Sequence, residues 1–474
     1  MTQTLRRAML GLLPLVIVCL LHTTSYARAD NAGFIYGTIT TNNGNSYTGI
    51  IRWGTEESFW DDLFNSTKTK NPNRKYLDKV AKSSRKESLK HRAEESSEME
   101  KTAEELSEEA SKQNDSEIRE KAEELKRRAR ELKEEAEDMA DEIKAHAKSI
   151  NIFGGTIQVN WNDWGEDHQY IIRFGDIKKL KIIGSEDAEV MTKDNEKQIV
   201  SGGSNDLGEE IVILDNAVGQ VTIPWKKIDN IVFSEIPSSV TPPAKRLYGT
   251  VSTDAGDFQG FIQWDCEECQ SVDKLDGDSE DGRMSIPMGS LKSIERKNSK
   301  SVRVEMKDGR KLVLRGTNDV DETNRGIMVE DPRFGRVTVP FNSLEKVEFE
   351  SASGTGKAYT EFIIPRPLRG TVTDDDGKTY HGRIVYDVDE TYTWEMLNGE
   401  NQEVQYCIPF TLVKSVSPKS EKVTEVKLQS GVTINLEGSN DVDERNSGIL
   451  IFTSGDNADP KYIDWKHVKQ IDFE

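Results

Sequence analysis

The chain contains little cysteine and little histidine. Among its 474 residues only four are cysteine and six are histidine. Cys19 lies in the N-terminal apolar stretch, which leaves Cys266, Cys269 and Cys407 for the rest of the chain. A small disulfide-stapled scaffold needs more cysteines than this, so ordinary apolar cores must hold the folded parts together.

Long apolar runs are missing beyond the N-terminus. There, Arg6 and Arg7 precede an apolar stretch that ends at Leu21, and "ARAD" follows, with Ala29 as its last small residue. This is the pattern of a secretory signal peptide cut after Ala29. The alternative is a membrane anchor, but the stretch is shorter than the roughly 20 residues that span a bilayer. We predict an exported bacterial protein, periplasmic or extracellular, with no integral membrane segment after cleavage.

Basic residues are outnumbered. The chain has 84 Asp and Glu against 63 Lys and Arg, a net charge of −21. A surface with an excess of negative charge repels phosphate backbones. We therefore expect no nucleic-acid partner.

Catalytic signatures are absent. The sequence has no HExxH, GxSxG, Walker or dinucleotide-binding motif. "GTGKA" at 354–358 lacks the first glycine and the Ser/Thr of a P-loop. In "CEEC", Cys266 and Cys269 could form a local disulfide or remain free thiols, and a zinc site would need further ligands nearby. We predict that the protein is not an enzyme, and we assign no catalytic, cofactor-binding or metal-ligating residues.

Internal repetition defines the domains. One line occurs three times: "IYGTITTNNGNSYTGIIRW" from Ile35, "LYGTVSTDAGDFQGFIQW" from Leu247 and "LRGTVTDDDGKTYHGRIVY" from Leu368. A second line follows each: "SGGSNDLGEEIVIL" at 201–214, "LRGTNDVDETNRGIMV" at 314–329 and "LEGSNDVDERNSGILI" at 436–451. The chain therefore contains three copies of one unit of about 105–110 residues.

Each copy divides again into two half-repeats. Six segments close with an aromatic residue or Met followed by spaced aliphatic residues, beginning at Phe174, Trp225, Met288, Phe341, Phe410 and Trp465. Before them lie short alternating runs with Gly-containing turns, the signature of β-hairpins. We expect four or five strands and a one-turn helix in each half-repeat. This layout resembles SH3-like, Sm-like and PRC-type barrels, which implies that each copy is a pair of small β-barrels.

The first copy carries an insertion between Leu63 and Phe174. Apolar residues recur in it at steps of three and four: Met99, Ala103, Leu106 and Ala110, then Ile118, Ala122, Leu125, Ala129, Leu132, Ala136, Met139, Ile143, Ala147 and Ile150. Such seams, separated by "QNDSE" at 113–117, predict two antiparallel helices over about 78–150. One loose charged helix is the alternative.

The predicted fold is mainly β, with an α insertion. The expected organisation is a signal peptide (1–29), β repeat 1 (30–233) with the helical hairpin (about 78–150), a linker (234–246), β repeat 2 (247–350), a linker (351–367) and β repeat 3 (368–474).

Two acidic segments resemble metal-binding loops. "LDGDSEDG" at 275–282 begins like an EF-hand, but its glycines miss the required position and Pro287 replaces the last ligand. Asp319, Asp321 and Asn324 could bind Ca²⁺ with hard oxygen ligands, or could only form a turn. The shortened first copy loses some of these residues, which favours the turn.

Three functions remain open. The leading hypothesis is a non-catalytic envelope or secreted repeat scaffold, whose helical hairpin contacts another envelope or extracellular protein. The alternatives are a calcium-dependent binding or adhesion module, and a hydrolase with a site between domains.

Overall fold

The computed structural model describes residues 31–73, 75–76, 97, 99–107, 121–122, 125–127, 129–130, 133, 169–202, 206–455 and 459–474. The predicted signal peptide, residues 1–29, lies outside them, so it stays a prediction.

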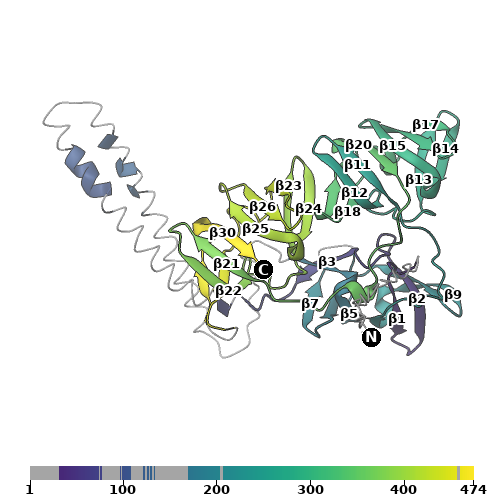
Figure 1. Cartoon of the computed structure of the whole chain (residues 1–474), viewed down its shortest axis with the longest axis horizontal. Helices are drawn as coiled ribbons and strands as arrows, with labels where there is room; N and C mark the ends of the chain where they lie inside the picture. Colours follow the sequence, from purple (N-terminus) through teal and green to yellow (C-terminus); the bar gives the residue numbers. More distant parts are fainter. Residues whose placement is uncertain are drawn as a thin grey trace, which may run out of the picture.

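The described residues form three antiparallel β units (Figure 1). Unit 1 contains β1 (Tyr36–Thr41), β2 (Ser46–Trp53), β3 (Leu63–Lys68), β4 (Gln169–Arg173), η1 (Phe174–Asp176), β5 (Ile177–Ile182), β6 (Asp187–Thr192), β7 (Lys197–Ser201), β8 (Glu210–Asp215), β9 (Gly219–Pro224), η2 (Trp225–Lys227) and β10 (Ile228–Phe233). Unit 2 contains β11 (Tyr248–Thr253), β12 (Gly256–Gln263), β13 (Lys274–Ser279), β14 (Gly282–Pro287), η3 (Met288–Ser290), β15 (Leu291–Asn298), β16 (Ser301–Met306), β17 (Lys311–Arg315), η4 (Asn318–Val320), β18 (Ile327–Asp331), β19 (Gly335–Val339), η5 (Phe341–Ser343) and β20 (Leu344–Phe349). After η6 (Tyr359–Glu361), unit 3 contains β21 (Arg369–Asp374), β22 (Thr379–Val385), β23 (Met396–Asn401), β24 (Val404–Pro409), η7 (Phe410–Leu412), β25 (Val413–Pro418), β26 (Thr424–Leu428), β27 (Thr433–Leu436), β28 (Ile449–Phe452), β29 (Lys461–Ile463), η8 (Trp465–His467) and β30 (Val468–Phe473).

The predicted one-turn helices are confirmed at all six closing motifs. Each is a 3₁₀ turn whose first side chain is buried: Phe174, Trp225, Met288, Phe341, Phe410 and Trp465. In four cases the residue before the turn is proline, whose fixed φ suits the extended conformation needed at that position. In β20, the strand that follows one of these turns, the buried residues Leu344 and Val347 are three positions apart.

Strands of the two half-repeats alternate within each sheet. The order in unit 1 is β4-β3-β7-β6-β5-β10-β1-β2-β8-β9, and unit 2 repeats it from β14 to β19. Strands β1–β5 come from one half-repeat and β6–β10 from the other. If every strand is replaced by its counterpart in the other half-repeat (β1 by β6, β2 by β7 and so on), the result is the same strand order in the opposite direction. A pseudo-twofold axis therefore lies between the paired strands β5 and β10.

The prediction of small closed barrels is wrong. Hairpin β3–β4 leaves its own half-repeat and pairs with β7, where Thr67 lies opposite Ser201. Strand β8 pairs with β2 of the other half-repeat, where Ile213 lies opposite Ile51. Strands that pair outside their half-repeat cannot close a barrel within it. The mainly β class is confirmed, as three antiparallel sheets.

Hairpin β23–β24 joins units 2 and 3. Strand β24 pairs with β19, so that Tyr406 lies opposite Val337. The Tyr406 ring also packs 5.6 Å from the ring of Phe334. The hairpin stays attached to its own unit through backbone hydrogen bonds between Glu400 and Glu437. Hairpin β23–β24 therefore belongs to the sheet of unit 2 and is connected to the sheet of unit 3 through an isolated β-bridge.

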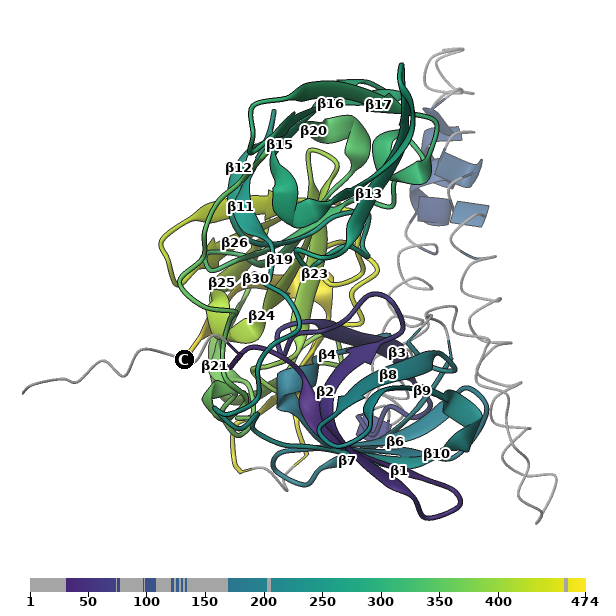
Figure 2. The ribbon, with the colours of Figure 1, turned by 90° about the vertical axis from the view of Figure 1, so that its right-hand side faces the viewer.

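Unit 1 contacts unit 2 through a buried arginine. The Arg246 guanidinium lies 4.1 Å from the ring centroids of both Phe59 and Phe261, and 3.1 Å from the Asp61 carboxylate. Unit 1 also contacts unit 3, where the rings of Tyr170 and Trp394 are 5.7 Å apart. Each unit thus touches the other two (Figure 2).

The linker at 351–367 also packs against unit 1. The Tyr359 ring lies 4.6 Å from the Trp60 ring. Lys193 donates hydrogen bonds to the carbonyls of Tyr359 and Phe362, at 2.5 and 2.9 Å. This segment is therefore part of the contact between units.

Helical residues occur between β3 and β4. They lie at 99–107 and, with gaps, between 121 and 133, apart from the β units (Figure 1). Lys126 donates to Ser107 at 3.4 Å, which connects the two stretches. Three predicted seam positions are fully buried: Ala103, Ala122 and Ala129. Most of the predicted hairpin, about 78–150, lies outside the described residues.

Candidate functional site at the loop crossings

Two connections cross in every unit, and their polar residues form the candidate site. In unit 1, β2 pairs with β8 and β3 pairs with β7, so the β2–β3 loop must pass the β7–β8 loop. We call each passage a loop crossing. The crossings comprise 54–62 with 206–209 in unit 1, 264–273 with 316–326 in unit 2, and 386–395 with 437–448 in unit 3.

A buried aromatic side chain connects the two loops at each crossing. It donates a hydrogen bond to the carbonyl oxygen of an aspartate in the second loop. The pairs are Trp53 with Asp206 at 2.7 Å, Trp264 with Asp319 at 2.9 Å and Tyr386 with Asp441 at 2.5 Å. The aromatic residue therefore has a structural role at the end of its strand.

The side chain of the same aspartate holds the next hairpin in place. Its Oδ2 accepts a backbone N–H from Asn65 in unit 1, from Asp276 at 2.6 Å in unit 2 and from Asn398 at 2.6 Å in unit 3. Burial raises the pKa of these carboxyls, to about 7 for Asp206, about 6 for Asp319 and about 7 for Asp441.

A glutamate lies beside this aspartate in every unit. It follows the aromatic residue by four positions and forms a β-bridge with it: Glu57 with Trp53, Glu268 with Trp264 and Glu390 with Tyr386. Burial, and then the neighbouring aspartate, raises the pKa of each glutamate, in the case of Glu268 to about 9. Each crossing therefore contains a pair of carboxyls that resist ionising together.

A further acid fixes the first loop of each crossing. One carboxylate oxygen accepts two consecutive backbone N–H groups: Asp62 from Ser58 and Phe59, Asp273 from Cys269 and Gln270, and Glu395 from Thr391 and Tyr392. These acids are part of the loop structure, and Glu395 also lines the cavity at the crossing of unit 3.

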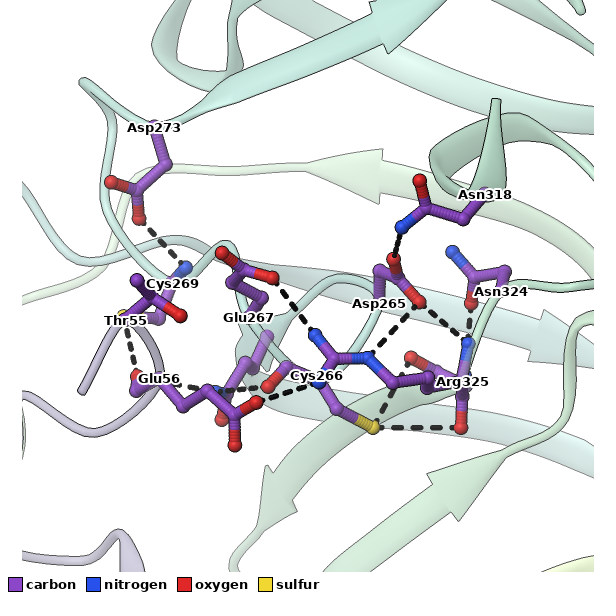
Figure 3. Close-up of polar contacts among 12 residues, drawn as sticks. Thr55, Glu56, Asp265, Cys266, Glu267, Cys269, Asp273, Asn318, Asn324 and Arg325 are labelled. Carbon is purple, nitrogen blue, oxygen red and sulfur yellow. Dashed lines mark hydrogen bonds and ion pairs between the residues drawn. The ribbon is translucent and has the colours of Figure 1, made fainter. Parts of the chain in front are cut away.

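Arg325 supplies the positive charge at the crossing of unit 2 (Figure 3). Its guanidinium lies 2.6 Å from Glu56 of unit 1 and 2.9 Å from Glu267. Its Nε is 3.7 Å from Asp265. The contact between units 1 and 2 therefore places a guanidinium among three carboxylates.

Lys68 of unit 1 supplies the positive charge at the crossing of unit 3. Its Nζ lies 3.0 Å from Asp389 and 2.9 Å from Glu395. Burial alone would lower the pKa of Lys68, but the two carboxylates raise it above its usual value. Beside this pair is a cavity of about 260 Å³, also lined by Glu390 and Asp441.

Three carboxyls gather at the crossing of unit 3. Asp387, Glu390 and Asp441 each have an oxygen within 4.8 Å of the other two. Asn440 donates to Asp387 at 2.8 Å, and Ser447 donates to it through its backbone N–H. Such a set of hard oxygen donors has the chemistry of a divalent-cation site.

The candidate calcium ligands predicted in unit 2 have local partners. Asp321 accepts the Thr323 N–H at 2.9 Å, and Asn324 accepts the Gly326 N–H at 2.9 Å. Gly326 has φ +119°, which other residues rarely adopt. Asp319 is directed to β13 through its bond to Asp276. These contacts suit the turn hypothesis.

The two cysteines of "CEEC" are free thiols in this structure. Cys266 Sγ lies 3.5 Å from the Arg325 carbonyl, and Cys269 Sγ lies 3.5 Å from the Glu56 carbonyl (Figure 3). Burial raises the pKa of both thiols, that of Cys266 to about 12. They are therefore protonated at neutral pH and poor nucleophiles. The EF-hand-like acids of 275–282 belong to hairpin β13–β14.

The buried glutamates Glu57, Glu268 and Glu390 were not predicted from the sequence. Their signal is the threefold recurrence of an aromatic residue and a glutamate four positions later: "WGTEE" from Trp53, "WDCEE" from Trp264 and "YDVDE" from Tyr386. This pattern can be recognised when the three copies are aligned, but the burial of the glutamates cannot be predicted from it.

The chain matches no protein-family model, no curated protein and no solved structure. Among the described residues, no helix combines the length and the apolar character needed to cross a membrane.

Proposed function

We propose that this protein is an exported, non-catalytic binding module. In this proposal the three β units form a scaffold, and the helical insertion of unit 1 contacts another envelope or extracellular protein. The helical hairpin over about 78–150 is part of the proposal.

The observation that carries this proposal is the position of the insertion. It replaces the tight turn of hairpin β3–β4, whose counterparts β13–β14 and β23–β24 turn within a few residues. The hairpin remains paired up to Thr67 and Gln169, which lie opposite each other at the insertion's two ends. An insertion at a hairpin tip leaves the sheet intact, so it can acquire a binding role without affecting the fold.

The contacts of the β units support a scaffold. Arg246, Arg325 and Lys68 all form ion pairs between units, and Arg246 and Lys68 are buried. Buried ion pairs with several partners fix the relative position of the groups they join. These ion pairs support a scaffold whose units keep fixed positions relative to one another.

The test is to replace residues 78–150 by a short Gly-Ser loop. We expect the β circular dichroism and the thermal transition of the β units to be unchanged, because the ends of the insertion are adjacent. Capture and crosslinking of an envelope protein by the full-length chain should be lost. As a matched control, the same Gly-Ser loop in the β13–β14 turn at 280–281 should leave capture unchanged. Capture that survives the replacement would place the binding surface on the β units, and loss of the β signal would place the insertion in the core.

A further inference from the structure

One cluster at the crossing of unit 3 has more oxygen ligands than its structural role requires. Asp387, Glu390 and Asp441 bring three carboxyl oxygens within 4.8 Å of one another. Glu390 Oε2 is buried and has no hydrogen-bond partner. A buried carboxyl oxygen left without a partner is costly, so its place next to two other carboxyls points to a missing positive ligand.

The spacing of these oxygens fits a calcium ion. Ca²⁺ binds oxygen at 2.3–2.6 Å, so two ligands on opposite sides of it lie about 4.6–5.2 Å apart. We propose that Asp387, Glu390 and Asp441 bind one Ca²⁺ ion at the crossing of unit 3. The cavity of about 260 Å³ beside Glu390 and Asp441 has room for the water molecules that complete the coordination. This site goes beyond the proposed binding function and does not depend on it.

Unit 1 cannot form the same site. Its crossing keeps Glu57 and Asp206, but Gly54 stands where unit 3 has Asp387. The third carboxylate is therefore missing there.

Unit 2 has the three carboxyls but also has its own cation. Asp265, Glu268 and Asp319 correspond to the three acids of unit 3. Arg325 stands at the position of Ser447, and its Nε lies 3.7 Å from Asp265. The Arg325 guanidinium beside Asp265 supplies a positive charge at this crossing, although Glu268 Oε2 has no hydrogen-bond partner. Ser447, at the same position in unit 3, supplies no positive charge.

Lys68 of unit 1 and Arg445 of unit 3 line the same cavity as Glu390 and Asp441, and each pairs with an acid outside the cluster. Lys68 pairs with Asp389 and Glu395, at 3.0 and 2.9 Å. Arg445 pairs with Asp443 at 2.6 Å. Even so, Glu390 Oε2 has no hydrogen-bond partner among the described residues, and a divalent ion would supply one.

Calcium binding to the full-length mature chain tests this inference. After treatment with EDTA and removal of the chelator, Ca²⁺ is titrated by calorimetry, and thermal unfolding is recorded with and without about 5 mM Ca²⁺, above the range of Kd typical of extracellular modules. We expect one ion per chain and a midpoint raised by several degrees. Asp387→Asn should weaken binding by about tenfold or more, because it removes one of three charged ligands. Ser447→Arg should abolish binding while keeping all three ligands.

The matched control is Asp265→Asn in unit 2, which should leave the calcium affinity unchanged. If Asp387→Asn does not fold, Ser447→Arg and Glu390→Gln carry the test. A chain that shows no binding heat and a midpoint within about 1 °C in calcium overturns the inference, because the carboxyls then only share protons. Binding that persists in both Asp387→Asn and Ser447→Arg also overturns it, because the ion then lies elsewhere.

Discussion

Glu57, Glu268 and Glu390 occupy the same position in the three units, and burial raises the pKa of each. Glu268 illustrates the consequence. Its pKa of about 9 means that the folded protein holds a proton at neutral pH that the unfolded chain releases. Between about pH 4.5 and about pH 9 the native state binds more protons, so the free energy of unfolding falls as the pH rises.

Replacing Glu268 by Gln should remove this dependence. Glutamine has nearly the same shape as the protonated acid and cannot ionise. We expect Glu268→Gln to raise the free energy of unfolding on the order of 2 kcal/mol at pH 8, and by less than about 1 kcal/mol at pH 5, because one pKa unit corresponds to 1.36 kcal/mol. Urea denaturation of both proteins at the two pH values measures the difference.

The control is Glu348→Gln, in the same unit. The Glu348 side chain is 58% exposed. Its replacement should change the stability by no more than about 0.5 kcal/mol at either pH. A loss of stability in Glu268→Gln at pH 8 would mean that Glu268 is ionised in the folded protein.

Hairpin β23–β24 is the element that departs from the common pattern of the units. In units 1 and 2 the corresponding hairpin pairs only within its own sheet, whereas β24 also covers β19 of unit 2. Strand β19 would otherwise be an edge strand with unpaired backbone groups. Pairing between units thus protects an edge that unit 2 cannot cover by itself.

Hydrogen exchange should detect this pairing. Fragment 245–350 keeps strands β11–β20, so we expect it to fold alone. The amides of 336–338 that face β24 should exchange about tenfold or more faster in the fragment than in the full chain, because β19 becomes an edge there. The amides of 302–304 in β16, which is flanked by β15 and β17, should remain equally protected. Equal protection of 336–338 in both proteins would argue against the pairing with β24.

Ion pairs, aromatic contacts and one strand pairing hold the three units together. Units 2 and 3 share a sheet, but unit 1 has no strand pairing with either of them among the described residues. Its contact with unit 3 includes Lys68, whose side chain is 8% exposed. Loss of a buried cation leaves its carboxylate partners in a poorly solvated place, which costs more than the pair contributes when intact.

Replacing Lys68 by Met should therefore destabilise the protein strongly. We expect a loss of about 3–5 kcal/mol in the free energy of unfolding, because Asp389 and Glu395 remain buried without their partner. Lys197→Met is the matched control: this lysine pairs with Glu189 at 2.8 Å, but its side chain is 53% exposed. Its replacement should cost less than about 1 kcal/mol. Similar losses for the two variants in urea denaturation would show that the Lys68 pairs contribute little.

Local features could be predicted from the sequence, and pairing partners could not. The six closing turns depend on an aromatic residue or Met and its neighbours, so they were predicted correctly. The alternation of apolar and polar residues in "VRVEM" predicts a strand, but it does not indicate which strand pairs with it. For this reason the exchange of hairpins between half-repeats was not predicted, and closed barrels were expected instead. The insertion between Leu63 and Phe174 was predicted from the aligned copies, but its place at the tip of hairpin β3–β4 was not.

The sequence alone determined the three repeats, their β character and the location of the insertion, because repetition and period-two alternation are properties of neighbouring residues. Only the tertiary structure decided that Glu390 lies beside Asp387 and Asp441, and that Lys68 of another unit pairs with Asp389 and Glu395. The physical reason is the crossing of loops. Which distant segments meet depends on the strand pairing that buries the most apolar surface over the whole sheet, and no local pattern records that choice.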